Sequence, residues 1–224
     1  MSEHWTVTFC GLIVAMLGPI FIAVASGRSA QPPHRLGALV LAQAGLVVIV
    51  AVVMAVIFFW EHNSLSSIGL KPLTVQSFAW GFILAVFFMY AVAPVVYWLL
   101  RRFCLESFDR GLSQLQGLPV WYLVLAVVIG GVAEEILYRG FSIERIAALT
   151  GSLWLAGAIP LVVFAIAHVP MWGWGPAFAT LVPGVVFTLF YLWQRDLAAC
   201  IVAHVVTDFA GIVVGPLMVR GRAS

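Results

Sequence analysis

Residues 146–194 read IAALTGSLWLAGAIPLVVFAIAHVPMWGWGPAFATLVPGVVFTLFYLWQ, and none of them is Asp, Glu, Lys or Arg. A helix that spans a bilayer needs about 20 mostly apolar residues, so this stretch is long enough for two spans. Two prolines and two glycines lie within residues 168–176, which are therefore expected to separate the two helices. The stretch predicts an integral membrane protein.

The composition of the whole chain supports the same class. Of 224 residues, 63% are hydrophobic, and 11 Lys and Arg with 9 Asp and Glu make only 20 charged residues. A soluble domain of this length would carry on the order of 50. High hydrophobicity excludes a disordered chain, and the scattered basic residues argue against nucleic acid as a partner. Cys10, Cys104 and Cys200 form no CxxC pair, which argues against a disulfide scaffold.

Uncharged segments bordered by tryptophans mark about seven spans of a polytopic, all-α transmembrane helical bundle. The predicted ranges are 6–26, 36–60, 78–100, a fourth that starts near 118, two within 146–194, and 197 to about 216. No basic residue precedes the first span, which is expected to be an uncleaved helix. The chain, 1–224, is interpreted as a single integral membrane domain.

The arginines predict the orientation of this bundle. Loops one–two and three–four share one side with the C-terminus, and this side holds seven arginines: Arg28, Arg35, Arg101, Arg102, Arg110, Arg220 and Arg222. The opposite side holds Lys71, Arg145, Arg195 and, depending on where the fourth helix ends, Arg139. The positive-inside rule then places the C-terminus in the cytoplasm and the N-terminus outside.

Six ionisable side chains interrupt apolar sequence: Glu134, Glu135, Arg139, His168, His204 and Asp208. A charge in the hydrocarbon region costs about 2.5–3.5 kcal/mol on insertion scales, so such residues normally face one another inside the protein. Six of them in one small protein predict a functional cluster.

The spacing of these residues suggests separate roles. Glu135 and Arg139 are four apart and can form a structural ion pair on one helix face. Glu134 is turned by about 100° from Glu135, so it is free for chemistry, although it could instead be a second partner of Arg139. His204 and Asp208 are also four apart, so Asp208 could orient that imidazole, or the two could form a simple packing contact.

The depth of these groups depends on the length of the fourth helix. If it continued to about residue 149, Glu134 would lie about 22 Å from that end, His168 about 25 Å and Asp208 about 18 Å from the same side. The cluster therefore requires a long, continuous fourth helix and lies in the half of the bilayer nearer the arginine-rich side. Glu144 and Arg145 are then expected at a solvated or headgroup-facing end of that helix.

Three motifs in this region resemble a known family. Residues 134–139 read EEILYR and fit EExxxR, residues 164–168 read FAIAH and fit FxxxH, and residues 204–208 read HVVTD and fit HxxxN/D. Their order and spacing resemble the CPBP family, the type II CAAX prenyl protease and bacteriocin-processing group of intramembrane proteases. The resemblance covers residues 118–216 as a catalytic core, with residues 6–117 as N-terminal spans.

The resemblance implies an intramembrane endopeptidase in which Glu134 and His168 activate a water. A buried carboxylate can act as a general base near neutral pH, and an imidazole can orient the same water. The family also implies that the terminal pair, His204 and Asp208, stabilises the oxyanion. Many members have Asn where this chain has Asp208. An ionised carboxylate donates no hydrogen bond, so Asp208 would have to be protonated or only orient His204.

Cofactors and partners follow from the same interpretation. Zinc is possible but disfavoured, because HExxH is missing from the sequence and a metal-free glutamate mechanism is preferred. The expected partners are the lipid bilayer and a membrane-anchored protein or peptide substrate, in a prokaryotic inner membrane. Two alternatives stay open: a noncatalytic scaffold or immunity protein, and a proton-coupled transporter.

Overall fold

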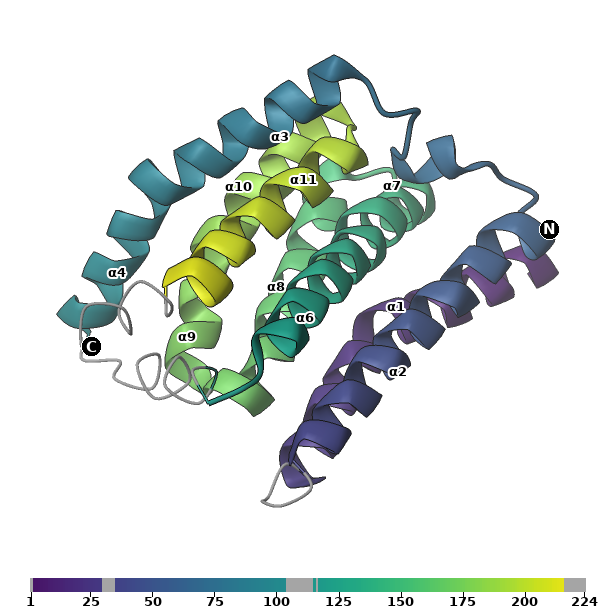
Figure 1. Ribbon diagram of the computed structural model, residues 1–224. Coiled ribbons are helices and arrows are strands. Elements are labelled where there is room, and N and C mark those ends of the chain that lie inside the picture. The colour runs from purple at the N-terminus through teal and green to yellow at the C-terminus, as the bar shows by residue number, and fades with distance from the viewer. Residues whose placement is uncertain (1, 30–34, 104–114, 116, 216–224) are drawn as a thin grey trace, which may run out of the picture.

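The computed structural model describes residues 2–29, 35–103, 115 and 117–215, and every element in these ranges is a helix. Seven helices are long and apolar enough to cross a membrane, which confirms the predicted all-α bundle (Figure 1). Several residues used above lie outside the described ranges: Cys104, Arg110, Pro216, Arg220 and Arg222.

Each span is one helix or a series of consecutive helical segments. The first three are α1 (Ser2–Ser29), α2 (Arg35–Ala55) with η1 (Val56–Trp60), and α3 (Val75–Phe87) with η3 (Phe88–Val92) and α4 (Ala93–Arg102). The other four are α6 (Val120–Glu134) with η4 (Glu135–Ile143) and α7 (Glu144–Thr150), α8 (Leu153–Trp172), α9 (Trp174–Ala179) with α10 (Leu181–Gln194), and α11 (Leu197–Asp208) with η5 (Phe209–Val214). A short 3-10 turn, η2 (Leu65–Ile68), lies between the second and third spans.

Three spans begin at a side-chain cap that the sequence provides. Thr74, Ser152 and Asp196 each accept a hydrogen bond from the backbone N–H three residues later, at 3.1, 3.3 and 3.0 Å. Such caps satisfy N–H groups that the first helical turn leaves without a partner. The polar residues between the apolar runs therefore determine where α3, α8 and α11 start.

The fourth span is long and continuous, as the depth argument required. It covers Val120–Thr150, 31 residues, and ends at Gly151, whose φ of 67° is a left-handed conformation that favours glycine. Its middle segment, η4, is wound as a π-helix, and all nine of its residues are buried. The π-helical winding is not predicted by the sequence motif.

The break between the fifth and sixth spans falls where it was predicted, although Pro170 does not end the helix. Pro170 lies inside α8, which continues to Trp172 and ends at Gly173 with φ 80°. Glycine adopts this conformation without the steric penalty that a side chain would add. The glycine, rather than the proline, therefore separates α8 from α9.

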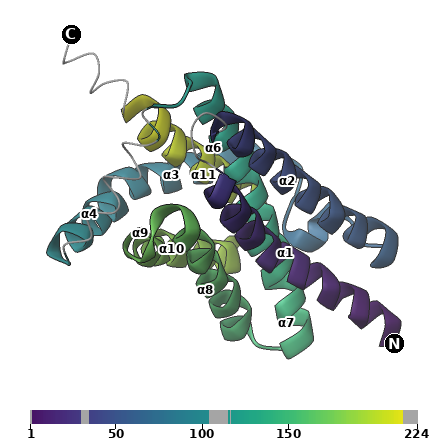
Figure 2. The ribbon, with the colours of Figure 1, turned by 90° about the horizontal axis from the view of Figure 1, so that it is seen from below.

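The fourth span lies at the centre of the bundle. Viewed from below, α6 and α7 run between α11 on one side and α1 with α2 on the other (Figure 2). Residues of η4 contact α1, α2, α8 and α11, and the main apolar core gathers around them. The motif EEILYR thus stands where most of the other spans meet.

The expectation that Glu144 and Arg145 lie at a solvated or headgroup-facing helix end is wrong for Arg145, whereas Glu144 is partly exposed. Arg145 is buried and binds the Glu61 carboxylate with Nε at 2.9 Å, and its Nη1 donates to the Ser67 carbonyl at 3.1 Å. Glu144 accepts a hydrogen bond from the Tyr191 hydroxyl at 2.9 Å and pairs with Arg195. These contacts join the ends of α2, α7 and α10, so two charges that look solvated in the sequence hold one end of the bundle together.

Candidate active site

A pocket of about 660 Å³ opens within the half of the bundle nearer loops one–two, three–four and five–six. Its lining includes side chains of α1, α2, α4, α6, α8, α10 and α11, most of them apolar. The acidic, basic and histidine side chains in its lining are Glu134, Arg139, His168, His204 and Asp208. The cluster therefore lies in the predicted half of the bundle. The motif residues come from the fourth, fifth and seventh spans, and residues of the first, second, third and sixth spans also line the pocket.

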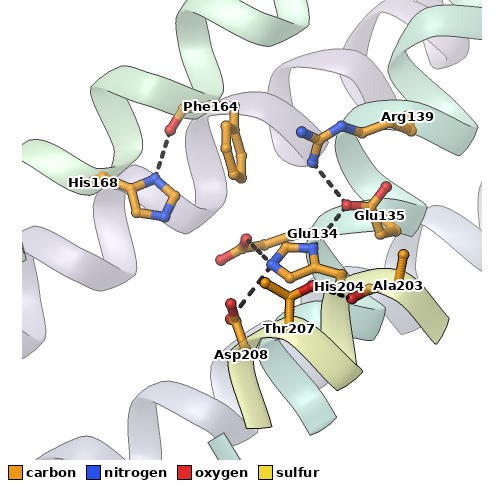
Figure 3. Close-up of polar contacts among 9 residues, drawn as sticks. All are labelled: Glu134, Glu135, Arg139, Phe164, His168, Ala203, His204, Thr207 and Asp208. Carbon is orange, nitrogen blue, oxygen red and sulfur yellow. Dashed lines mark hydrogen bonds and ion pairs between the residues drawn. The ribbon is translucent and has the colours of Figure 1, made fainter. Parts of the chain in front are cut away.

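Glu135 lies fully buried beside this pocket and binds two partners with one oxygen. Its Oε1 accepts a hydrogen bond from Arg139 Nη1 at 3.0 Å and lies 2.8 Å from His204 Nδ1 (Figure 3). The predicted ion pair with Arg139 is confirmed. The contact with His204 was not predicted, because the two residues are 69 positions apart and no spacing rule relates them.

Two aromatic rings hold the guanidinium of Arg139. The guanidinium carbon lies 4.4 Å from the centre of the Phe164 ring and 5.4 Å from that of Phe187. A cation over an aromatic face is stabilised by the ring quadrupole, most strongly where water is excluded. Phe164 also contacts the Tyr138 and His168 rings. It therefore both packs the core and forms a wall of the pocket.

His204 faces two further carboxylates with its other nitrogen. Nε2 lies 3.7 Å from Glu134 Oε2 and 3.5 Å from Asp208 Oδ2. Because the Glu135 carboxylate accepts from Arg139, the His204 Nδ1 carries the proton in that contact. Glu134 pairs with His204 and, in the described part of the chain, forms no ion pair with Arg139. This geometry favours the interpretation of Glu134 as a group separate from the Glu135–Arg139 pair.

His168 lines the same pocket from the opposite wall. Its Nδ1 lies 2.8 Å from the Phe164 backbone carbonyl, which can only accept, so Nδ1 carries the proton and Nε2 is an acceptor in the neutral ring. Among the described residues, no hydrogen bond or ion pair joins His168 to Glu134, His204 or Asp208. Figure 3 shows the imidazole and the Glu134 carboxylate on either side of an open space.

Two carboxylates of the site are accessible from the pocket. The side chains of Glu134 and Asp208 are 24% and 37% exposed, whereas Glu135 and Arg139 are buried. The two adjacent glutamates thus differ in environment: one can meet a ligand, and the other holds the framework.

A metal ion does not fit the donor set. Within the described ranges, no group of three or more His, Cys, Asp or Glu side chains is placed so as to hold one. Zinc sites require three or four such ligands at about 2.0–2.3 Å. The buried carboxylate nearest His204 is already bound to Arg139.

Two residues that line the pocket were not indicated by the motifs. Gln43 of α2 is a polar side chain in the pocket wall, and Gly130 of α6 lies one turn before Glu134 with open space where a Cβ would be. Gln43 could have been noticed in the sequence, because it is a polar residue inside an otherwise apolar predicted span. Nothing in the sequence distinguishes Gly130 from Gly131, so Gly130 could not have been found.

Comparison with known proteins identifies the region that carries this site. No curated protein and no solved structure matches the chain. A family model described as type II CAAX prenyl endopeptidase Rce1-like matches residues 116–210, which include all three motifs. The match leaves the first three spans outside and agrees with the range of the resemblance. Residues 116–210 of this chain are therefore similar to the Rce1-like group of type II CAAX prenyl endopeptidases.

Proposed function

We propose that this protein is an intramembrane endopeptidase that hydrolyses a peptide bond of a membrane-associated substrate with a water activated by Glu134 and His168. The observation that carries this proposal is the pocket itself: a mostly apolar cavity of about 660 Å³ has Glu134, His168, His204 and Asp208 together in its lining. An apolar pocket with a few converging polar groups is a typical enzyme site. The family match supports the same class of activity.

The proposed roles follow from which atoms are free. Glu134 reaches the pocket and would take a proton from a water whose other hydrogen bond goes to His168 Nε2. The resulting hydroxide attacks the carbonyl carbon of the scissile bond. The proton on Glu134 then passes to the amide nitrogen as the C–N bond breaks, so the products are a carboxylic acid and an amine.

His204 is proposed to stabilise the oxyanion of the tetrahedral intermediate. Glu135 fixes the ring through Nδ1, and Nε2 is directed towards the pocket, where a protonated Nε2 would donate to the developing charge. Asp208, 3.5 Å from the same nitrogen, is proposed to orient His204 rather than to donate itself. This division of roles explains how the chain could function with Asp in place of the more common Asn.

We further propose that water activation needs no metal. The described residues offer Glu134 as a base within reach of the pocket, and their donor set does not fit zinc. A general base contributes about 100- to 10,000-fold to a rate, a range that a carboxylate and an imidazole can supply together.

The test is cleavage of a panel of membrane-anchored peptides by the purified full chain in detergent, with products identified by mass spectrometry. We expect hydrolysis at one position. In ¹⁸O-water, one ¹⁸O should enter the new carboxylate. Stringent removal of metals should leave the rate unchanged. Loss of activity with chelator and recovery on addition of zinc would contradict the metal-free mechanism. If no peptide is cleaved while proton flux into vesicles requires Glu134, the transporter alternative is supported. If neither activity is found, the noncatalytic scaffold is supported.

A further inference from the structure

In the described part of the chain, Gln43 of the second span lines the pocket with an amide oxygen that has no hydrogen-bond partner. This oxygen, Oε1, is buried. Ser26 of α1 also lines the pocket, but its hydroxyl donates to the Ile22 carbonyl at 2.8 Å. Inside a membrane protein no bulk water relieves an unpaired amide, so such a group is costly unless a ligand supplies the missing partner.

The face of α2 that carries Gln43 is directed at the pocket. Leu39, one turn earlier, packs in one cluster with Leu123 and Val127 of α6, and Leu46 continues the same face and lines the pocket. Helices α2 and α6 are neighbours that run in the same direction (Figures 1 and 2). Gln43 therefore belongs to the wall along which a substrate approaches Glu134.

The spacing along the two helices gives the distance between Gln43 and the reacting bond. Leu39 of α2 packs beside Leu123 and Val127 of α6. Gln43 lies one turn, about 6 Å, further along α2 from the open end of the pocket than Leu39. Glu134 lies seven residues, about 10 Å, beyond Val127 and about 16 Å beyond Leu123. Gln43 is thus about 5–10 Å nearer the open end of the pocket, which corresponds to roughly two to three residues of extended peptide.

We infer that Gln43 is a substrate-positioning residue, whose amide oxygen accepts a hydrogen bond from a backbone N–H about two to three residues from the scissile bond. The inference rests on the proposed endopeptidase function and adds a specific contact to it. It assigns a role to α2, which lies outside the segment that matches the family model. A backbone contact would hold an extended segment in register without selecting its side chains.

The test uses binding, so that it does not depend on turnover. The probe is a dansyl-labelled decapeptide of alternating Leu and Ala, together with analogues that each carry one N-methylated backbone amide. Their dissociation constants are measured by fluorescence in detergent for Glu134→Gln and for the same protein with Gln43→Leu or Ser26→Ala. Ser26→Ala is the matched control, because that hydroxyl is already satisfied within its own helix.

We expect one or two analogues to bind the Glu134→Gln protein about 3- to 10-fold more weakly than the parent peptide. Addition of Gln43→Leu should remove this difference without lowering the melting temperature, and Ser26→Ala should preserve it. The inference is overturned if the decapeptide does not bind or if all analogues bind alike. It is also overturned if the same analogues still bind more weakly after Gln43→Leu. It is also overturned if Gln43→Leu lowers the melting temperature and leaves binding unchanged. A wild-type protein that binds the decapeptide with this pattern but cleaves no peptide would refute the proposed function, and of this inference it would support only the contact between Gln43 and a peptide N–H.

Discussion

A single oxygen atom of Glu135 connects the Arg139 guanidinium to the His204 ring. Its Oε1 contacts both Arg139 and His204, and its Oε2 has no hydrogen-bond partner among the described residues. The guanidinium therefore both neutralises a buried carboxylate and, through it, fixes the ring of His204. A substitution at Arg139 should therefore lower the stability of the fold and also change the orientation of the His204 ring.

Arg139→Ala is expected to destabilise the fold severely. The substitution leaves Glu135 as a buried carboxylate without its cation and removes the contacts with Phe164 and Phe187. Breaking a buried pair in this way costs about 3–5 kcal/mol. The measurement is the melting temperature and detergent-extracted yield of the purified variant.

The control for this substitution is Arg195→Gln, which removes the cation of an exposed pair. The Arg195 side chain is 58% exposed, so its pairing with Glu144 should contribute less than about 1 kcal/mol. If Arg139→Ala were as stable as Arg195→Gln but inactive, Arg139 would belong with the groups that act on substrate, and the framework role would be wrong.

At the scale of elements, the π-helical segment η4 gives the site a geometry that the motif alone does not specify. The pair Glu135 and Arg139 could be predicted from an i, i+4 spacing, and the long fourth helix from the depths of the ionisable groups. The π-helical winding, the Glu135–His204 contact and the pocket walls from α1 and α2 could not. They depend on packing between segments far apart in the sequence, and periodicity carries no information about such contacts.

Gly130→Leu is expected to block the pocket while preserving the fold. Gly130 lies one turn before Glu134, lines the pocket, and has no atom within 4 Å of the position of an added Cβ. Leucine also favours a helix over glycine by about 0.8 kcal/mol, so stability should be kept or raised. Displacement of the substrate should lower the cleavage rate on the order of 100-fold. Steady-state cleavage and thermal unfolding check the two expectations.

Gly131→Leu is the matched control, one residue further along the same helix. A Cβ at Gly131 would lie 3.0 Å from Cγ2 of Val205, so this variant should lose stability. Full activity in a well-folded Gly130→Leu would show that substrate does not pass this point, and the proposed binding of substrate in this pocket would be wrong.

At the scale of the whole molecule, the two ends of the bundle have different construction. One end is closed by a largely buried pair between Glu61 and Arg145 and by a pair between Glu144 and the exposed Arg195, and the other end contains the pocket. The sequence places Glu144 and Arg145 correctly at the end of the fourth helix. It does not show that Glu61, 84 residues away, turns Arg145 into a buried contact.

The orientation of this asymmetric bundle stays a prediction from the arginine count. In a background with Cys10, Cys104 and Cys200 replaced, Ser2→Cys should react with an impermeant thiol reagent in intact cells, and Ser224→Cys should be protected. Ser224 lies outside the described residues, so its label reports topology only. The reverse pattern would place the pocket in the outer half of the bilayer and favour exported proteins as substrates.

The most direct test of the central claim is the turnover of purified Glu134→Gln beside wild type on one peptide that wild type cleaves. Glutamine keeps the size of the side chain but cannot take a proton from water. With expression and melting temperature unchanged, the rate should fall by about 100- to 10,000-fold. A well-folded Glu134→Gln that cleaves at the wild-type rate would show that Glu134 is not the base and would contradict the account.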